Sequence, residues 1–307
     1  MSGRAGRGWI GSLLMAAGML AGDLPAAAAS QGGSPGAAPP LRVSHQARAV
    51  APGEAVLLTI RAAGPLVEVG GRAFGKAVVG YEGDTPAVWH ALVGIDLETR
   101  PGRVRVEIEA RSTDGSRLRA TYPLTVARKG FPTRRLSVAP EFVTPPAAVQ
   151  ARIERERVRL AKVLEEVTPR PLWAGGFSPP TAGDVISRFG ARSIFNGQAR
   201  APHRGVDLRG ASGTPVVAPA GGTVALAEDL YFSGTTVVLD HGLGVHSILG
   251  HLSRIDVREG AAVAGSDGIG AIGATGRVTG PHLHWTLRIG SASVDPMSVM
   301  SVLGLPR

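Results

Sequence analysis

Cysteine is absent from all 307 residues of the chain, so neither a disulfide nor a thiolate metal site is available to it. Any bound metal ion must therefore be held by histidine, aspartate or glutamate. Aromatic residues make up only 5%, whereas 43 glycines and 23 prolines favour short strands joined by tight turns over long helices. The remaining composition, 44% hydrophobic and 19% charged, is typical of a globular protein, and the length suits two domains.

Two further features are missing from the sequence. Lysine and arginine form no cluster interleaved with aromatics, which argues against a nucleic-acid partner despite a formal charge of +9. An anionic cell-envelope polymer suits that charge, and so does simple solubility. Beyond the first thirty residues, no segment reaches the ~18 consecutive apolar residues of a membrane helix.

Residues 1–29 have the pattern of a secretory signal peptide. Arg4 and Arg7 form a positive start, residues 9–22 an apolar stretch, and Ala27 to Ala29 a small-residue cleavage site. An uncleaved anchor is the alternative, but the position of the small residues favours cleavage. We therefore expect a periplasmic or secreted protein with no stable membrane span after signal cleavage, and a flexible linker over residues 30–40.

Residues 41–127 favour a β-sandwich accessory domain of the immunoglobulin-like kind. Residues 104–110 alternate strictly between apolar and polar side chains, and Asp114-Gly115 then provides a hairpin turn. His45 and His90 are isolated in this domain, and we expect both to be structural.

Residues 128–171 are predicted to connect this domain to the rest of the chain. Apolar residues at helical spacing predict a helix over residues 146–167. The helix is interpreted either as a spacer or regulatory arm, or as a helix packed between domains.

The last part, residues 172–307, returns to short strands and contains six of the eight histidines. In a strand, His282 and His284 lie on one face, so both can meet one metal, or one can bind it while the other transfers protons. His203 and Asp207 add a nitrogen and a carboxylate oxygen. Three such ligands leave a fourth position for water, as at a catalytic zinc. Imidazole with one carboxylate favours zinc, with cobalt or manganese as substitutes.

Histidines outside the ligand set are suited to proton transfer near neutral pH. A lone histidine is more often a satisfied core residue. Here the co-occurrence of three glycine-framed histidine segments argues against that interpretation.

At these segments the sequence resembles the lysostaphin-type zinc metalloendopeptidases, which cleave peptidoglycan peptides. The family motifs stand here as HRGVD (203–207), GHLS (250–253) and GPHLH (280–284), and the resemblance extends over about residues 180–300. It implies that His203, Asp207 and His284 bind one Zn²⁺ per chain, and that His251 and His282 are the catalytic histidines.

The resemblance also implies a mainly β protein whose residues 172–307 form an antiparallel β-sheet metallopeptidase domain. The N-terminal β-domain and the helix resemble accessory regions of Gram-negative members. Two departures from the family pattern concern substrate positioning or rate more than metal binding: Leu249 replaces a frequent aromatic, and Thr286 a frequent glutamate.

Three other residues near the motifs are assigned as follows. His241 is expected to be structural, and the role of His246 stays open. In some members an asparagine upstream of the first motif fills the open metal position and keeps the enzyme latent, and Asn196 is the candidate for that role here.

The sequence therefore predicts a zinc-dependent endopeptidase that hydrolyses peptide cross-links of bacterial peptidoglycan, using a zinc-bound water with histidine acid–base assistance. The alternative is a catalytically inactive regulator that activates other cell-wall hydrolases. Such regulators typically lose metal ligands, whereas this chain keeps three ligands and two catalytic histidines. The expected partners are peptidoglycan and, as a second candidate, an envelope regulator protein.

Overall fold

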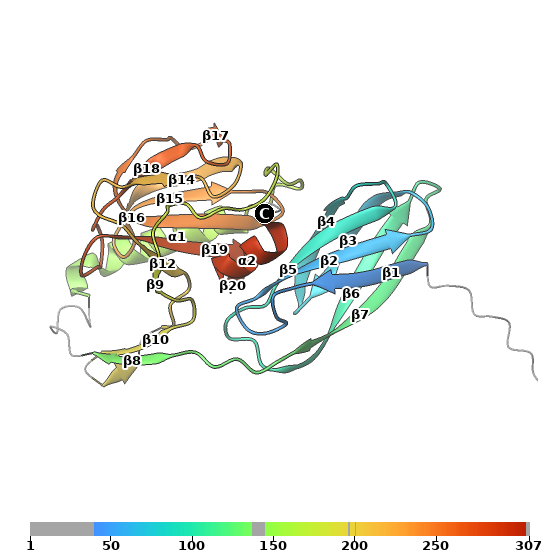
Figure 1. Ribbon diagram of the computed structural model, residues 1–307, viewed down its shortest axis with the longest axis horizontal. Coiled ribbons are helices and arrows are strands. Elements are labelled where there is room, and N and C mark those ends of the chain that lie inside the picture. Colours follow the sequence, from blue (N-terminus) through green and yellow to red (C-terminus); the bar gives the residue numbers. More distant parts are fainter. Residues whose placement is uncertain (1–39, 137–144, 196, 200, 305–307) are drawn as a thin grey trace, which may run out of the picture. The chain divides into compact units, whose positions relative to one another are not determined.

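The computed structural model describes residues 40–136, 145–195, 197–199 and 201–304 (Figure 1). The predicted signal peptide, nearly all of the predicted linker and Asn196 lie outside these ranges. The protein is mainly β, as the sequence predicts, with two α-helices in the described part. Neither helix is long and apolar enough to cross a membrane.

The N-terminal part is a β-sandwich of seven strands. Their order is β1-β2-β5-β4-β3-β6-β7, which matches the order of a constant-type immunoglobulin sandwich. β4 joins the two sheets, because its first half pairs with β3 and its second half with β5. The strands are β1 (Leu41–Gln46), β2 (Ala55–Ala62), β3 (Leu66–Ala73), β4 (Lys76–Glu82), β5 (Val88–Gly94), β6 (Gly102–Ser112) and β7 (Arg117–Val126).

The sandwich core follows from the alternation seen in the sequence. Val106 and Ile108 of β6 are buried while Glu107 between them is exposed, and Val56, Leu58 and Ile60 of β2 pack into the same cluster. Burying each such side chain stabilises the fold by about 1.5–3 kcal/mol.

The segment after the sandwich contains a strand that the sequence pattern does not predict. β8 (Thr133–Leu136) pairs in parallel with β10 (Arg192–Phe195), which forms a hairpin with β11 (Gln198–Ala199). The strand lies in a basic stretch without alternation, so its formation depends on a partner about sixty residues further along the chain.

Helix α1 (Gln150–Glu165) lies within the range 146–167 for which helical spacing predicts a helix. Leu160, Val163 and Leu164 pack against the C-terminal sheet, in a cluster with Leu226 and Val238. The helix therefore covers part of one face of that sheet.

The C-terminal sheet has the order β17-β14-β15-β16-β19-β12-β9, with β18 joined to β13 and β16 and β20 joined to β19, and all of these pairs are antiparallel. Its elements are β9 (Val185–Ser187), β12 (Val206–Arg209), β13 (Pro215–Val217), β14 (Gly222–Leu230), β15 (Gly234–Asp240), β16 (Val245–Ile255), β17 (Ala262–Val263), β18 (Gly268–Ile272), β19 (His282–Ile289), β20 (Ala292–Val294) and helix α2 (Pro296–Leu303).

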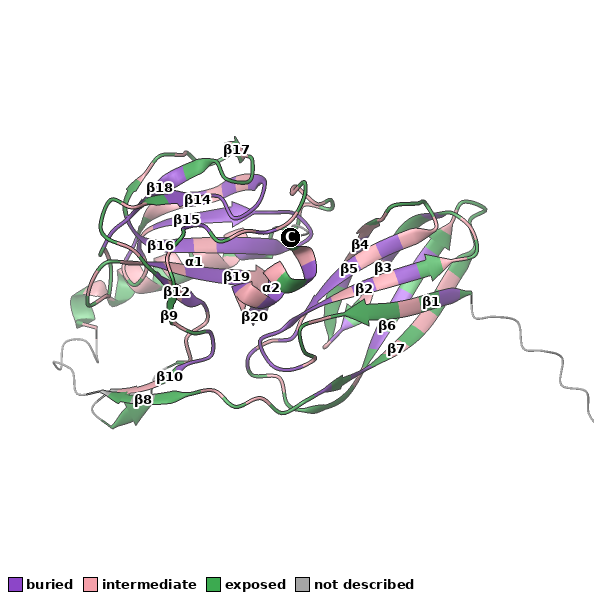
Figure 2. Cartoon of the chain, in the orientation of Figure 1, coloured by how far each residue is buried: buried purple, intermediate pink, exposed green. Residues whose placement is uncertain are grey.

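The two faces of strand β19 have different roles. Leu283, Trp285 and Leu287 are fully buried in the core of this domain, and the central strands β15, β16 and β19 are largely buried (Figure 2). Alternation then places His282 and His284 on the opposite face. This face carries the predicted site.

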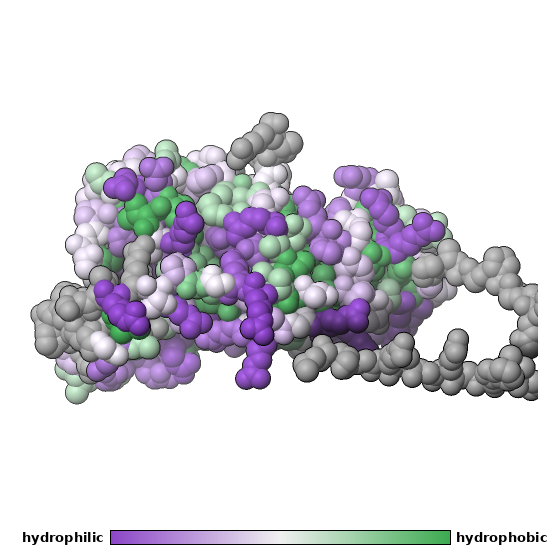
Figure 3. All heavy atoms as spheres, turned by 60° about the horizontal axis from the view of Figure 1, so that its bottom comes forward, coloured by the Kyte–Doolittle hydropathy of each residue, from purple (hydrophilic) through white to green (hydrophobic). Residues whose placement is uncertain are grey.

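Hydrophilic and hydrophobic residues are interspersed over the face of the molecule drawn in Figure 3. Most large apolar side chains are instead in the buried clusters, and few are exposed in the described part of the chain, among them Val158 and Phe232.

Candidate metal centre

Three of the predicted residues meet where β12 lies beside β19. Asp207 is directly opposite His284 in the register of these antiparallel strands, so the two side chains project from the same face. His203 precedes β12 and is held by two backbone bonds to the preceding loop, from its own N–H to Ala191 O and from Gly190 N–H to its carbonyl. The pairing of two distant strands therefore builds the cluster.

The facing atoms of the cluster form a nearly equilateral triangle. Nε2 of His203 lies 3.1 Å from Oδ1 of Asp207 and 3.1 Å from Nδ1 of His284, and the last two atoms are 2.9 Å apart. Zinc bonds of ~2.0–2.1 Å at tetrahedral angles place neighbouring donor atoms about 3.3 Å apart. The triangle thus fits one face of a zinc tetrahedron and leaves its fourth corner open.

The protonation states of these groups suit a metal. Burial raises the pKa of Asp207, but the adjacent rings of His203 and His284 outweigh burial and hold that pKa well below its usual range. Burial lowers the pKa of His284, against the opposing effect of the Asp207 carboxylate. Near neutral pH the carboxylate is therefore ionised and His284 is neutral, as metal ligation requires.

His251 reaches the site through a backbone irregularity. Strict alternation from buried Val245 and Leu249 along β16 would point His251 into the core. A bulge between β15 and β16 sets one residue, Thr236, against two, Gly250 and His251, and His251 has a φ of 64°. The bulge turns its ring towards the metal face, with its centroid 4.9 Å from that of His282 and 5.8 Å from that of His284.

Backbone carbonyls fix the orientation of both predicted catalytic histidines. Nδ1 of His251 lies 2.9 Å from Thr275 O, and Nδ1 of His282 lies 2.8 Å from Gly280 O. A carbonyl only accepts, so each Nδ1 carries the proton and, in a neutral ring, each Nε2 is left with a free lone pair. Burial lowers the pKa of His251 to about 4, which keeps this ring neutral near pH 7.

The rings of the two predicted ligand histidines, His203 and His284, are also held by hydrogen-bonding contacts. Nδ1 of His203 lies 3.2 Å from Arg188 O, which leaves Nε2 for the metal. His284 uses the opposite nitrogen, because its Nε2 lies 2.9 Å from Oγ1 of Thr286 while Nδ1 faces Asp207. The sequence pattern did not point to Arg188 or to the carbonyl of Thr275, since any residue type offers a backbone carbonyl.

Position 205, within the first motif, has no room for a side chain, so glycine is required there. A Cβ atom there would lie 2.5 Å from Trp285 O, 2.7 Å from Oγ1 of Thr286 and 2.9 Å from Cε1 of His284. The missing side chain allows β12 to approach β19 closely enough to form the cluster.

The other residues that the sequence singled out lie apart from the cluster. Leu249 is fully buried in the domain core. His241 is buried and bonds Gly221 O and Ser247 Oγ through its two ring nitrogens. His246 is also buried, and within the described residues neither of its ring nitrogens has a hydrogen-bond partner.

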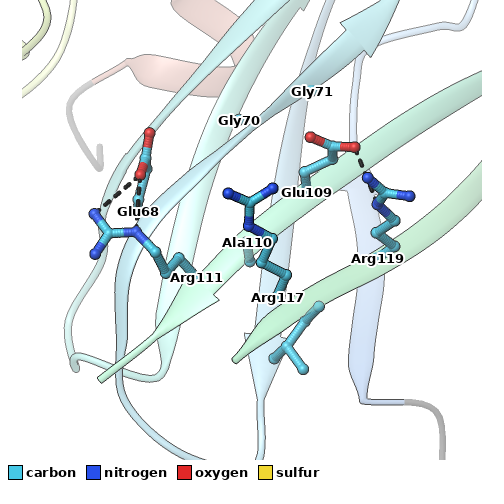
Figure 4. A pocket seen from close by; sticks show the side chains of 9 residues that line it. Glu68, Gly70, Gly71, Glu109, Ala110, Arg111, Arg117 and Arg119 are labelled. Atoms are coloured by element: carbon cyan, nitrogen blue, oxygen red, sulfur yellow. Dashed lines mark hydrogen bonds and ion pairs between the residues drawn. The ribbon is translucent and has the colours of Figure 1, made fainter. Parts of the chain in front are cut away.

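A separate hollow lies on the N-terminal sandwich, over strands β3, β6 and β7 (Figure 4). Ion pairs join Arg111 to Glu68 and Arg119 to Glu109 across its surface, and Gly70 and Gly71 leave it without side chains on one side. All four paired side chains are more than half exposed, and no histidine lines the hollow. The hollow therefore has no donor set comparable to the histidine cluster.

Two imidazoles and a carboxylate around an open corner form the donor set of a catalytic metal centre. The family model of Peptidase family M23 matches residues 201–296, which include every residue of the cluster. A crystal structure of an M23 peptidase from Pseudomonas aeruginosa is 31% identical, with a TM-score of 0.63, and the match covers 83% of this chain and 96% of that one. The chain belongs to peptidase family M23.

Curated relatives match less than half of the chain. The DD-carboxypeptidase/endopeptidase Mpg of Neisseria meningitidis is 37% identical over 140 residues, 45% of this chain and 31% of Mpg. The peptidoglycan DD-endopeptidase ShyA of Vibrio cholerae is 40% identical over 114 residues, 37% of this chain and 26% of ShyA. A lipoprotein NlpD/LppB homologue of Pseudomonas aeruginosa is 35% identical over 129 residues, 41% of this chain and 40% of that protein. The matches thus span less than half of each relative.

Proposed function

We propose that this protein is a zinc-dependent endopeptidase that hydrolyses peptide cross-links in bacterial peptidoglycan. The observation that carries the proposal is the triangle of His203, Asp207 and His284, whose donor atoms are 2.9–3.1 Å apart beside His251 and His282. One carboxylate and two neutral imidazoles are a donor set that zinc accepts, and His203 Nε2, Asp207 Oδ1 and His284 Nδ1 would hold it.

Zinc held by these residues would act as a Lewis acid, lowering the pKa of a water molecule and polarising the scissile carbonyl group. The free Nε2 of His251 accepts the proton of the attacking water and can return it to the leaving amine. Nε2 of His282 lies 3.7 Å from Oδ1 of Asp207 and so borders the same space. There it can orient the water and, once it carries a proton, stabilise negative charge on the substrate oxygen.

The substrate class is inferred from the relatives and the charge of the chain. ShyA is named a peptidoglycan DD-endopeptidase, and Mpg a DD-carboxypeptidase/endopeptidase. The formal charge of +9 favours association with an anionic wall polymer. With the signal-peptide pattern of residues 1–29, these features support a periplasmic or secreted location, with an envelope regulator protein as a further candidate partner.

The alternative function is a catalytically inactive regulator of other wall hydrolases. A regulator has no need of an ordered donor triangle or of two histidines whose ring orientation is fixed by carbonyl groups. The complete and geometrically consistent site therefore favours the enzyme.

Digestion of purified peptidoglycan sacculi by the mature protein tests the proposal. We expect release of soluble muropeptides, loss of that release when a chelator removes zinc, and its return when zinc is added back. His284→Ala removes one of three ligands and is expected to abolish both zinc binding and digestion. His45→Ala, at an exposed histidine of the sandwich, is the matched control and should retain both.

Two results would contradict this assignment. Stoichiometric zinc in the His284→Ala protein would show that the ligand set is wrong. A zinc-loaded wild-type protein that leaves sacculi intact would instead favour the regulator. Mass spectrometry of the released muropeptides identifies which bond is cut.

A further inference from the structure

We propose that Thr286 is a positioning residue whose hydroxyl group accepts the Nε2 proton of His284 and thereby presents Nδ1 of that ring to the metal. The inference rests on the proposed zinc site. Nε2 of His284 lies beside the Thr286 hydroxyl group, whereas Nδ1 of His203 lies 3.2 Å from the carbonyl oxygen of Arg188 and 3.3 Å from Oγ of Ser187.

Metal binding through one ring nitrogen of His284 decides which nitrogen carries the proton. Nδ1 of this ring faces Asp207 Oδ1 at 2.9 Å and His203 Nε2 at 3.1 Å, so Nδ1 is the atom directed at the metal position. A neutral imidazole carries one proton, and a metal ion binds the ring nitrogen that lacks it. Metal binding through Nδ1 therefore requires that proton to be on Nε2.

The hydroxyl group of Thr286 is the acceptor for the Nε2 proton. Oγ1 of Thr286 lies 2.9 Å from Nε2, and Thr286 is buried, two residues along the same strand and on the same face. Without an acceptor, a buried N–H either stays unsatisfied or the proton moves to Nδ1, and in that tautomer Nδ1 has no lone pair for a metal.

The rotamer preference of threonine and the close packing of Gly205 restrict the position of the hydroxyl group. Threonine is β-branched, and a β-branched side chain has few χ1 rotamers. A Cβ atom added at Gly205 would lie only 2.7 Å from Oγ1 of Thr286, so the backbone of Gly205 packs closely against this hydroxyl group. The close approach of β12 thus leaves just enough room for this hydroxyl group beside the His284 ring. Threonine here supplies a neutral acceptor for the Nε2 proton of His284.

The test measures zinc affinity of the full chain by competition with a chelating indicator. Thr286→Val keeps the shape but removes the acceptor, and we expect its zinc affinity to fall by about 10- to 100-fold. Thr286→Ser restores the hydroxyl group and should bind zinc within about threefold of wild type, whereas Thr286→Ala should resemble Thr286→Val. In the cobalt-substituted protein, the visible spectrum should change for the valine and alanine variants and not for serine.

Thr168→Val is the matched control, because it also removes a hydroxyl group bonded to a buried partner, Asp240, at a distance from the metal ligands. It should lower the thermal stability of the metal-free protein and leave zinc affinity unchanged. Wild-type zinc affinity in both Thr286→Val and Thr286→Ala would overturn the inference, as would a serine variant as weak as valine. If wild-type protein fails to digest sacculi while Thr286→Val still weakens zinc binding, the proposed function fails and the role of Thr286 stands.

Discussion

Replacing Gly205 by alanine tests whether the close approach of β12 and β19 builds the metal site. The added Cβ would lie 2.5 Å from the backbone oxygen of Trp285, so the strands must separate, because that oxygen belongs to the sheet and cannot rotate away. Overpacking of this kind costs about 1–3 kcal/mol. Replacing glycine by alanine in a compatible conformation stabilises a protein by about 0.4–1 kcal/mol, so a net destabilisation is expected.

The matched control is Gly268→Ala, because Gly268 lies in strand β18 and a Cβ there meets no atom within 4 Å. Urea unfolding of both metal-free variants measures the difference in stability, and indicator competition measures zinc affinity. We expect Gly205→Ala to unfold at lower urea than wild type and to bind zinc at least about tenfold more weakly, because Thr286 and His284 are displaced together. Equal midpoints and equal zinc affinities for the two variants would refute the steric explanation.

Two further predictions concern the histidines. Asparagine tolerates the left-handed backbone conformation of His251, so His251→Asn should keep wild-type zinc affinity. Sacculus digestion, measured as muropeptide release, should fall by about 10²–10⁴-fold. Unchanged digestion would exclude His251 as the base. The metal-free protein should lose stability as the pH falls from 6.5 towards 4, because burial lowers the folded-state pKa of both His241 and His251 to about 4 while the unfolded chain takes up protons near 6.5. Each of these two histidines then lowers the free energy of unfolding by about 2 kcal/mol at pH 5. His241→Gln should therefore show a smaller fall in its urea midpoint than wild type between pH 7 and pH 5. An equal fall in the variant and in wild type would contradict this account.

Local sequence patterns were sufficient to predict much of the architecture. The alternation over residues 104–110 corresponds to half-buried β6, and helical spacing corresponds to α1, because each pattern depends only on which side of an element is buried. β8 was not predicted, since its partner β10 is supplied by a distant part of the chain.

The residue types of the proposed metal site were also readable from the sequence. With no cysteine, a metal requires imidazole and carboxylate groups, and the His-x-His spacing predicts that His282 and His284 lie on one face of a strand. Thr286 was recognised only as a departure from a family pattern, because its contact with His284 depends on rotamer and on the space left by Gly205.

The sequence by itself therefore determined the chemical identity of the donors, the strand periodicity and the family resemblance, all of which are encoded over short distances in the chain. Only the tertiary structure decided which nitrogen of each ring faces the metal position and how His251 turns out of the core. Those features arise from strand register, a β-bulge and carbonyl acceptors on other segments, and such long-range geometry has no local signature in the order of amino acids.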